Sequence, residues 1–258
     1  MVRKKIGLAL SGGGARGFSH VGVLNVLAQH DIHFDIIAGT SAGSIVGAAL
    51  AAGMSAPEIA AMASRVGYAN VMRPSLSPRG LFSNAPLGSL IGREYPVIRF
   101  EDLKIPFGAV VYDLDAGEEI LMKDTGDLVF AVRASCAVPG VFAPLTGPNG
   151  HLFVDGGVSS PLPIDAVRAM GADIVIAVDL IGCGGTYTSP PRTAMGFAIR
   201  AALALISSAS RNQASQADVL IQPQIAHLRP DQIGKRDEFI SLGEAAANSA
   251  IDEIRKLL

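Results

Sequence analysis

Within its first 53 residues the chain twice places a short apolar run before a glycine-rich turn and a helical pattern. The first run, Ile6–Leu10, leads into residues 12–17, GGGARG. The second, residues 36–38, leads into residues 39–43, GTSAG, and then into a small-residue helix predicted over 44–52. Continuous apolar runs are typical of strands buried on both faces of a parallel sheet. Two such units in succession therefore predict an α/β arrangement.

The alternation of apolar runs and helical patterns continues along all 258 residues. It predicts one domain over residues 1–258, an α/β three-layer sandwich with a largely parallel central sheet. The strand-like runs, most of them apolar throughout, fall at 6–10, 34–38, 107–112, 119–122, 151–154, 174–178 and 219–222. The most apolar helical pattern, at 194–206, contains an arginine and is too short to span a bilayer.

Two segments interrupt this pattern. Residues 68–100 and 182–192 are rich in proline and glycine, which predicts loops. Loops of that length are lids, binding elements or plain connectors, and all of these stay open for 68–100. Its scattered apolar side chains would either guide an acyl chain or fill a satellite core; they are Leu81, Phe82, Leu87, Leu90 and Ile91.

Composition argues against several classes of function. The net charge is −2, so no global basic field predicts nucleic-acid binding. The two cysteines, Cys136 and Cys183, lie far apart and match no metal-binding spacing, so neither a metal nor another cofactor is expected. The N-terminal apolar run is too short for the core of a signal peptide. These features favour a cytoplasmic protein, with peripheral membrane contact left open.

The first glycine-rich turn has two interpretations. Gly12, Gly14 and Gly17 fit the dinucleotide fingerprint G-x-G-x-x-G between a strand and a helix. That motif also needs an acidic residue at the far end of the second strand, whereas Asp35 lies at its start, about 10 Å away. In the other interpretation the turn is an anion cradle, because backbone N–H groups at the start of a helix stabilise negative charge. We favour the cradle.

The second glycine-rich turn has the form G-x-S-x-G, a nucleophile elbow that holds the hydroxyl of Ser41 out on a sharp strand-to-helix turn. An alcohol needs a neighbouring base to take its proton. None of the five histidines has a sequence context that marks it as that base. Three aspartates end strand-like runs, and composition does not choose among them: Asp113, Asp155 and Asp179. Asp155 stands out because two glycines follow it and leave open space beside the carboxylate.

Taken in order, the GGGARG turn, the GTSAG elbow and the Asp155-Gly156-Gly157 sequence resemble the motifs of the patatin-like phospholipase family. Residues 134–140, ASCAVPG, also resemble a block of that family in which a proline shapes the site. The similarity runs from about residue 6 to residue 180, and the compact size resembles the small bacterial members.

The resemblance implies a serine lipid acyl hydrolase of the phospholipase A, lysophospholipase or esterase type, which cleaves a lipid or acyl ester through an acyl-enzyme. Ser41 would be the nucleophile and Asp155 the general base of a Ser-Asp dyad. Arg16 would hold the glycine-rich loop or add positive charge near the oxyanion. The N–H groups of the oxyanion hole would come from three consecutive glycines: Gly12, Gly13 and Gly14.

Two other functions stay open. A regulatory or scaffolding protein of the same fold would bind a partner with weak or no hydrolysis, although the intact Ser41 and Asp155 argue against it. An ordinary α/β-hydrolase would use Ser41, a middle aspartate and His227. That fold normally places several strands before its elbow, whereas only two strand-like runs precede Ser41.

Overall fold

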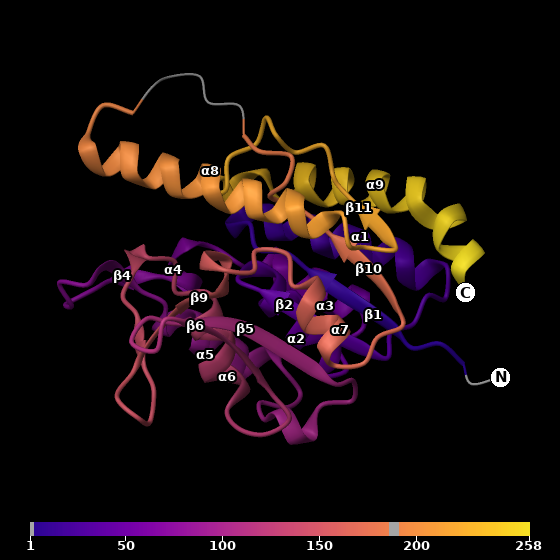
Figure 1. Ribbon diagram of the computed structural model, residues 1–258, viewed down its shortest axis with the longest axis horizontal. Helices are drawn as coiled ribbons and strands as arrows, with labels where there is room; N and C mark the ends of the chain where they lie inside the picture. The colour runs from indigo at the N-terminus through magenta and orange to yellow at the C-terminus, as the bar shows by residue number, and fades with distance from the viewer. Residues whose placement is uncertain (1–2, 186–190) are drawn as a thin grey trace.

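The computed structural model describes residues 3–185 and 191–258 (Figure 1). Its strands are β1 (Ile6–Leu10), β2 (Ile36–Thr40), β3 (Arg73–Pro74), β4 (Gly80–Ser83), β5 (Phe107–Asp113), β6 (Glu118–Lys123), β7 (Gly140–Phe142), β8 (Leu145–Thr146), β9 (Leu152–Asp155), β10 (Ile174–Val178) and β11 (Val219–Ile221). Its α-helices are α1 (Phe18–Gln29), α2 (Ala42–Ala51), α3 (Ala56–Ser64), α4 (Tyr68–Val71), α5 (Ala85–Glu94), α6 (Leu128–Ser135), α7 (Ile164–Ala169), α8 (Ala194–Ala214) and α9 (Arg236–Leu257). Short 3₁₀ turns are η1 (Gly14–Gly17), η2 (Phe100–Asp102), η3 (Gly156–Val158) and η4 (Ile233–Lys235).

The main sheet is mixed and mostly parallel. Its strand order is β11-β10-β1-β2-β5-β9-β8, and β6 also pairs with β5. The pairs from β11 to β5 are parallel. The strands β6, β8 and β9 pair in the antiparallel direction. The predicted fold class is therefore confirmed, with an antiparallel edge added to the parallel core.

Helices cover both faces of this sheet because successive side chains of each buried strand point to opposite faces. On β1, Leu8 belongs to the core cluster that contains Leu24 of α1 and Ile251 of α9. The next residue, Ala9, belongs to a second cluster with Val167 of α7. One core lies on each face of the sheet, so the sheet forms the middle layer and the helices on its two faces form the outer layers. Figure 1 shows the N-terminal end of α8 extending past the strands of the sheet.

The predicted strands are all present, and those at 6–10 and 174–178 have the predicted bounds. The short strands β3, β4, β7 and β8 were not predicted, because runs of two to four residues carry little periodicity. The helix predicted at 194–206 continues to Ala214. None of the helices in the two described ranges combines the length and apolarity needed to cross a membrane.

The prediction of a loop over 68–100 is wrong for most of that segment. It contains α4, β3, β4 and α5. Leu87, Leu90 and Ile91 are buried in the main core, so these three do not guide an acyl chain. Leu81 is 69% exposed and Phe82 is half-buried. The loop predicted over 182–192 includes residues 186–190, which lie outside the described residues.

Candidate active site

Ser41 occupies a strained turn between β2 and α2. Its backbone has φ 52° and ψ −122°, a conformation that costs a residue with a side chain about 1–3 kcal/mol. The turn is tight enough that a Cβ on Gly43 would lie 2.1 Å from the carbonyl oxygen of Leu10. The N–H of Ser41 donates to Ser135 Oγ, at 2.9 Å. The elbow is thus held by the neighbouring strand and by α6.

Sheet register brings Asp155 to this turn. Thr40 at the end of β2 pairs with Val110 of β5, and the next residue of β5, Val111, pairs with Asp155 of β9. The sheet was predicted to be largely parallel, but β9, which ends at Asp155, runs antiparallel to β5. Its end still meets the elbow, because the pairing of β9 with β5 begins near the end of β5.

The Asp155 carboxyl is buried, and only one of its two oxygens accepts a hydrogen bond from the described residues. It is 5% exposed, and its Oδ1 accepts the N–H of Gly157 at 2.7 Å. In the described part of the chain its Oδ2 has no hydrogen-bond partner. Burial raises the pKa of Asp155 to about 6, while the Ser41 side chain and the Gly157 N–H oppose that rise. The Ser41 hydroxyl is thus near enough to lower the pKa of the carboxyl, but the two side chains do not form a regular hydrogen bond. Catalytic hydrogen bonds are often long in sites without substrate.

The glycine-rich loop lies directly over Ser41. A Cβ on Gly12 would lie 3.2 Å from the Ser41 Cβ. The Gly12 N–H already donates to the carbonyl oxygen of Pro161, at 3.0 Å, so this geometry does not fit the prediction that it binds an oxyanion. Within residues 3–185 and 191–258, the N–H groups of Gly13 and Gly14 have no acceptor. These two are the donors of the loop that remain available to a ligand.

Arg16 holds the loop through backbone carbonyls. Its side chain is 5% exposed and donates to Leu228 O at 2.9 and 3.1 Å. It also donates to Leu180 O at 3.0 Å and to Gly184 O at 2.8 Å. Of the two roles predicted for Arg16, these contacts support holding the loop. The guanidinium ties η1 to the segments that follow β10 and β11.

The two other strand-ending aspartates are fully engaged. Asp113 Oδ1 accepts the N–H groups of the following turn, and its Oδ2 lies 2.7 Å from His151 Nδ1. Asp179 accepts two backbone N–H groups and the hydroxyl of Ser210 through Oδ1, and Gln222 Nε2 at 3.2 Å through Oδ2. Both carboxylates stabilise turns. Neither has a free oxygen for a serine.

Four of the five histidines have hydrogen-bond partners other than Ser41 in the described structure. His151 pairs with Asp113, and the hydrogen bond with that carboxyl raises the pKa of His151. His227, the base of the α/β-hydrolase alternative, lies 3.2 Å from Glu238 on the surface. His20 binds Ser11 O at 2.8 Å, and burial lowers its pKa to about 4, so the ring is neutral at neutral pH.

Sequence reasoning missed Ser135. It lies within the 134–140 block, but the sequence drew attention only to Pro139, which is exposed in the turn after α6. A serine at the end of a helix carries no signal that its hydroxyl will accept a distant backbone N–H. The adjacent Cys136 lies 3.8 Å from Ser44 Oγ, and burial raises the pKa of its thiol. Cys136 therefore stays protonated beside the elbow.

Among the described side chains, no three His, Cys, Asp or Glu residues cluster so as to hold a metal ion. The polar groups gathered here are a serine hydroxyl, a carboxyl with a free oxygen and two unengaged N–H groups. Such a set can activate an alcohol and stabilise an oxyanion.

Comparison with known sequences places these elements in a family. Residues 8–168 match the family described as "Patatin-like phospholipase". The chain is 36% identical over 193 residues to an "Uncharacterized NTE family protein" of Mycobacterium tuberculosis, covering 74% of this chain and 52% of that protein. It is 38% identical over 184 residues to "Patatin-like phospholipase domain-containing protein 6" of Homo sapiens, covering 68% of this chain and 13% of that protein. The chain thus spans about half the length of the mycobacterial protein.

Solved structures show the same fold. VipD from Legionella pneumophila matches with a TM-score of 0.60 at 16% identity, over 97% of this chain and 67% of VipD. The type III effector protein ExoU matches with a TM-score of 0.55 at 14% identity, over 97% of this chain and 53% of ExoU. At such identities the likeness concerns the fold alone. Since the family match covers more than half of the sequence, this chain belongs to the patatin-like phospholipase family.

Proposed function

We propose that the chain is a serine lipid acyl hydrolase, of the phospholipase A, lysophospholipase or esterase type, with Ser41 as nucleophile and Asp155 as general base. The observation that carries the proposal is the free, buried Oδ2 of Asp155 beside a serine in a nucleophile elbow. A carboxylate with a pKa of about 6 is a better base for an alcohol than an ordinary aspartate. Family membership supports a lipid ester as the substrate class.

In the first step Ser41 Oγ attacks the ester carbonyl carbon while its proton passes to Asp155. The carbonyl oxygen becomes an oxyanion, and the N–H groups of Gly13 and Gly14 donate to it. A donor of this kind contributes about 3–4 kcal/mol to the transition state. The tetrahedral intermediate collapses, Asp155 returns the proton to the leaving alcohol, and Ser41 carries the acyl group.

In the second step water attacks the acyl-enzyme. Asp155 takes a proton from the water, and the same N–H groups stabilise the second oxyanion. When the intermediate collapses, the fatty acid leaves and the proton returns to Ser41. A dyad without histidine has no strong general acid for a poor leaving group, so esters and thioesters should be cleaved well ahead of a matched amide.

A fluorophosphonate probe and a lipid-ester assay test this function. The wild type should label and release fatty acid, and Ser41→Ala should do neither. Ser249→Ala, an exposed serine on α9, is the matched control and should behave as wild type. Asp155→Asn should lower turnover by about 10²–10⁴-fold. A folded wild type that neither labels nor hydrolyses would favour the regulatory alternative, and labelling that survives in Ser41→Ala would remove this serine from the mechanism.

A further inference from the structure

Helix α8 turns polar side chains toward the protein. Ser207 and Ser210 lie in the second half of this helix, and both are buried. Ser207 Oγ donates to Ile181 O at 3.1 Å, and Ser210 Oγ donates to Asp179 Oδ1 at 2.8 Å. The inner side of α8 is therefore polar, and it is bound to the loop that follows β10.

The outer side of the same helix is apolar. Phe197, Ala201 and Leu205 follow one another at intervals of four residues, so they form one stripe along the helix. By helical spacing this stripe lies on the opposite side from Ser207 and Ser210. Phe197 is 60% exposed and Leu205 is 73% exposed. A surface helix normally turns its apolar side to the core and its polar side to water, so α8 reverses the usual arrangement.

Exposed apolar residues also surround the stripe. Residues 201–205, AALAL, are all exposed. Because one helical turn takes 3.6 residues, five consecutive exposed residues leave no side of the helix fully covered at that point. In Figure 1 the N-terminal end of α8 lies past the strands of the sheet. Single apolar side chains on a surface are ordinary, but a contiguous patch of them marks a contact site for a protein or a lipid.

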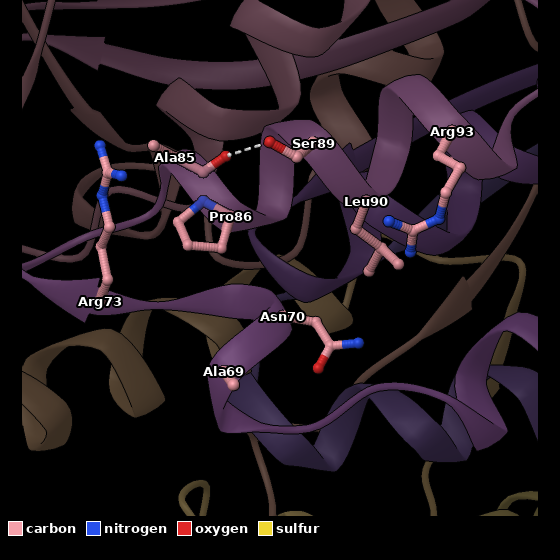
Figure 2. Close-up of a pocket in the computed structure, with 8 residues that line it drawn as sticks. All are labelled: Ala69, Asn70, Arg73, Ala85, Pro86, Ser89, Leu90 and Arg93. Carbon is pink, nitrogen blue, oxygen red and sulfur yellow. Dashed lines mark hydrogen bonds between the residues drawn. The ribbon is translucent and has the colours of Figure 1, made fainter.

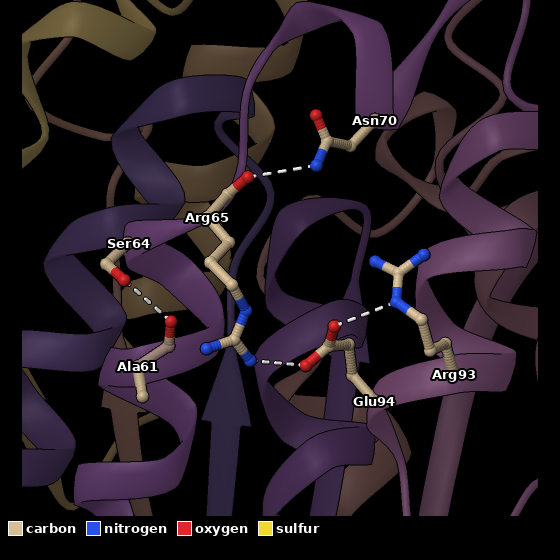
Figure 3. Close-up of polar contacts among 6 residues, drawn as sticks. All are labelled: Ala61, Ser64, Arg65, Asn70, Arg93 and Glu94. Carbon is tan, nitrogen blue, oxygen red and sulfur yellow. Dashed lines mark hydrogen bonds and ion pairs between the residues drawn. The ribbon is translucent and has the colours of Figure 1, made fainter.

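The usual arrangement is seen on α5. Leu87 of this helix is buried in the main core, whereas the exposed guanidinium groups of Arg65 and Arg93 share the carboxylate of Glu94 (Figure 3). Arg93 and Ser89 also line the open pocket beside α5 (Figure 2). The outer side of α5 is therefore charged and polar. The apolar outer stripe distinguishes α8 from this helix.

The sequence around α8 is basic. No aspartate or glutamate lies between Asp179 and Asp218, and three arginines do: Arg192, Arg200 and Arg211. The whole chain, in contrast, has a net charge of −2. An apolar stripe in a segment with positive charge and no negative charge complements a surface of acyl chains and anionic headgroups.

The stripe begins next to the loop that covers the nucleophile. The carbonyl oxygen of Ile181 accepts the Ser207 hydroxyl. A Cβ on Gly12 would lie 3.4 Å from Ile181 Cδ1 and 3.2 Å from the Ser41 Cβ. Leu205 precedes Ser207 by two residues, which is about 3 Å along the helix axis. A surface that contacts the stripe would therefore lie beside the edge of the sheet that holds Ser41.

We propose that the stripe of Phe197, Ala201 and Leu205 docks on the surface of an anionic lipid bilayer, with the phenylalanine and leucine side chains among the acyl chains. The choice of lipid rests on the hydrolase function proposed above, because long-chain esters are held in bilayers by their apolar chains. A second copy of the chain fits less well, since it would bring the same arginines together without an acidic residue from this segment. The helix lies along the bilayer, because its inner side stays bound to the protein.

A single tryptophan tests the contact directly, since the chain contains none. In Phe197→Trp the emission should shift to shorter wavelength with vesicles of equal parts phosphatidylcholine and phosphatidylglycerol, and brominated lipid should quench it. Leu257→Trp is the matched control, because this exposed residue ends α9, at the other end of the molecule in Figure 1, and should show neither effect. Emission from Phe197→Trp that vesicles leave unchanged would overturn the proposal.

Flotation of the whole chain with the same vesicles measures the affinity. Phe197→Gln/Leu205→Gln should lower the partition coefficient by about tenfold or more, because two apolar side chains no longer leave water. Leu257→Gln should bind as wild type does. Added salt should weaken wild-type binding, as should vesicles of phosphatidylcholine alone. Thermal melting verifies that the variants are folded, and equal partition of wild type and the double variant would contradict docking through the stripe.

Turnover of two esters separates docking from the proposed hydrolase function. On a long-chain ester in vesicles the double variant should lose about tenfold or more in kcat/KM, and on a soluble short-chain ester it should match wild type. If wild type cleaves the soluble ester and does not bind vesicles, docking fails and the hydrolase function stands. If it binds vesicles through the stripe and cleaves neither ester, the hydrolase function fails and docking stands.

Light scattering without lipid tests the competing occupant. A wild-type dimer that becomes a monomer in the double variant, together with no binding of wild type to vesicles, would show that a second copy covers the stripe. That result would overturn the proposal. An oligomeric state that the double variant shares with wild type, together with its weaker binding to vesicles, is the result expected for a lipid-docking helix.

Discussion

Replacing Asp155 by asparagine should stabilise the fold at neutral pH while it removes the proposed base. Burial raises the pKa of this carboxyl from 3.8 to about 6. Between these values the folded state keeps a proton that the unfolded state has already lost. Stability therefore falls as the pH rises through this window. Below it both states are protonated, and above it the folded chain carries a buried charge with one unpartnered oxygen.

The size of the effect follows from the two pKa values. The gap between 3.8 and about 6 corresponds to about 3 kcal/mol, because one pKa unit is worth about 1.4 kcal/mol. Asparagine is neutral at every pH, and its Oδ1 can still accept the N–H of Gly157. Asp155→Asn should thus raise the free energy of unfolding by up to about 3 kcal/mol above about pH 7 and change it little near pH 4.

Urea unfolding at pH 4 and pH 7.5, followed by far-ultraviolet circular dichroism, measures this difference. Asp113→Asn is the control with the opposite sign. Burial acts to raise the pKa of Asp113, but hydrogen bonds from Ala116 and His151 outweigh it and lower the pKa. Asp113 therefore stabilises the fold at neutral pH, and its replacement should weaken the fold there. The reasoning fails if Asp155→Asn shifts stability equally at both pH values or destabilises the chain at pH 7.5.

Three further outcomes are expected. Ser135→Ala leaves the buried N–H of Ser41 without its acceptor, which should cost about 1–3 kcal/mol in urea unfolding and slow fluorophosphonate labelling. Gly14→Ala puts a Cβ 2.6 Å from a backbone oxygen at a φ of 59°, so labelling should slow severely. In contrast, Gly92→Ala, with no atom within 4 Å, should leave labelling unchanged. The kcat/KM for a neutral ester should rise with pH and level off above about 6 as Asp155 loses its proton, and a flat profile from pH 4.5 to 7.5 would contradict that role.

The strands of the parallel core could be predicted because burial on both faces requires a continuous run of apolar residues in the sequence. Ile6–Leu10 and Ile174–Val178 pair with each other along their full length, and every residue in both is buried. Any polar residue inside such a strand would be buried without water, so the run stays apolar from end to end. The apolar run therefore predicts both that a strand is present and at which residues it begins and ends.

The helix α5 could not be predicted from the same kind of reasoning. Pro86, Gly88 and Gly92 argue against a helix when only the sequence is known, and each of the two glycines lowers the helix propensity by about 1 kcal/mol. Burial of Leu87, Leu90 and Ile91 is worth about 1.5–3 kcal/mol for each side chain, so packing outweighs propensity. Pro86 lies in the first turn, where a missing N–H costs nothing. The deciding contacts come from elements distant in sequence.

The hydrogen bonds that distinguish the three strand-ending aspartates could not be predicted from the sequence. Asp113, Asp155 and Asp179 all end strand-like runs, and only the two glycines after Asp155 set it apart along the chain. In the structure all three are at least 95% buried. They differ in their donors, which come from residues such as His151 and Ser210, 38 and 31 positions away. Two of the carboxylates have hydrogen bonds to both oxygens and serve as supports for turns. Among the described residues no donor reaches one oxygen of the third carboxylate, so that oxygen can take the proton of a serine hydroxyl in the mechanism proposed above. The property that favours Asp155 for the proposed role of base is therefore a missing contact, which no local pattern can encode.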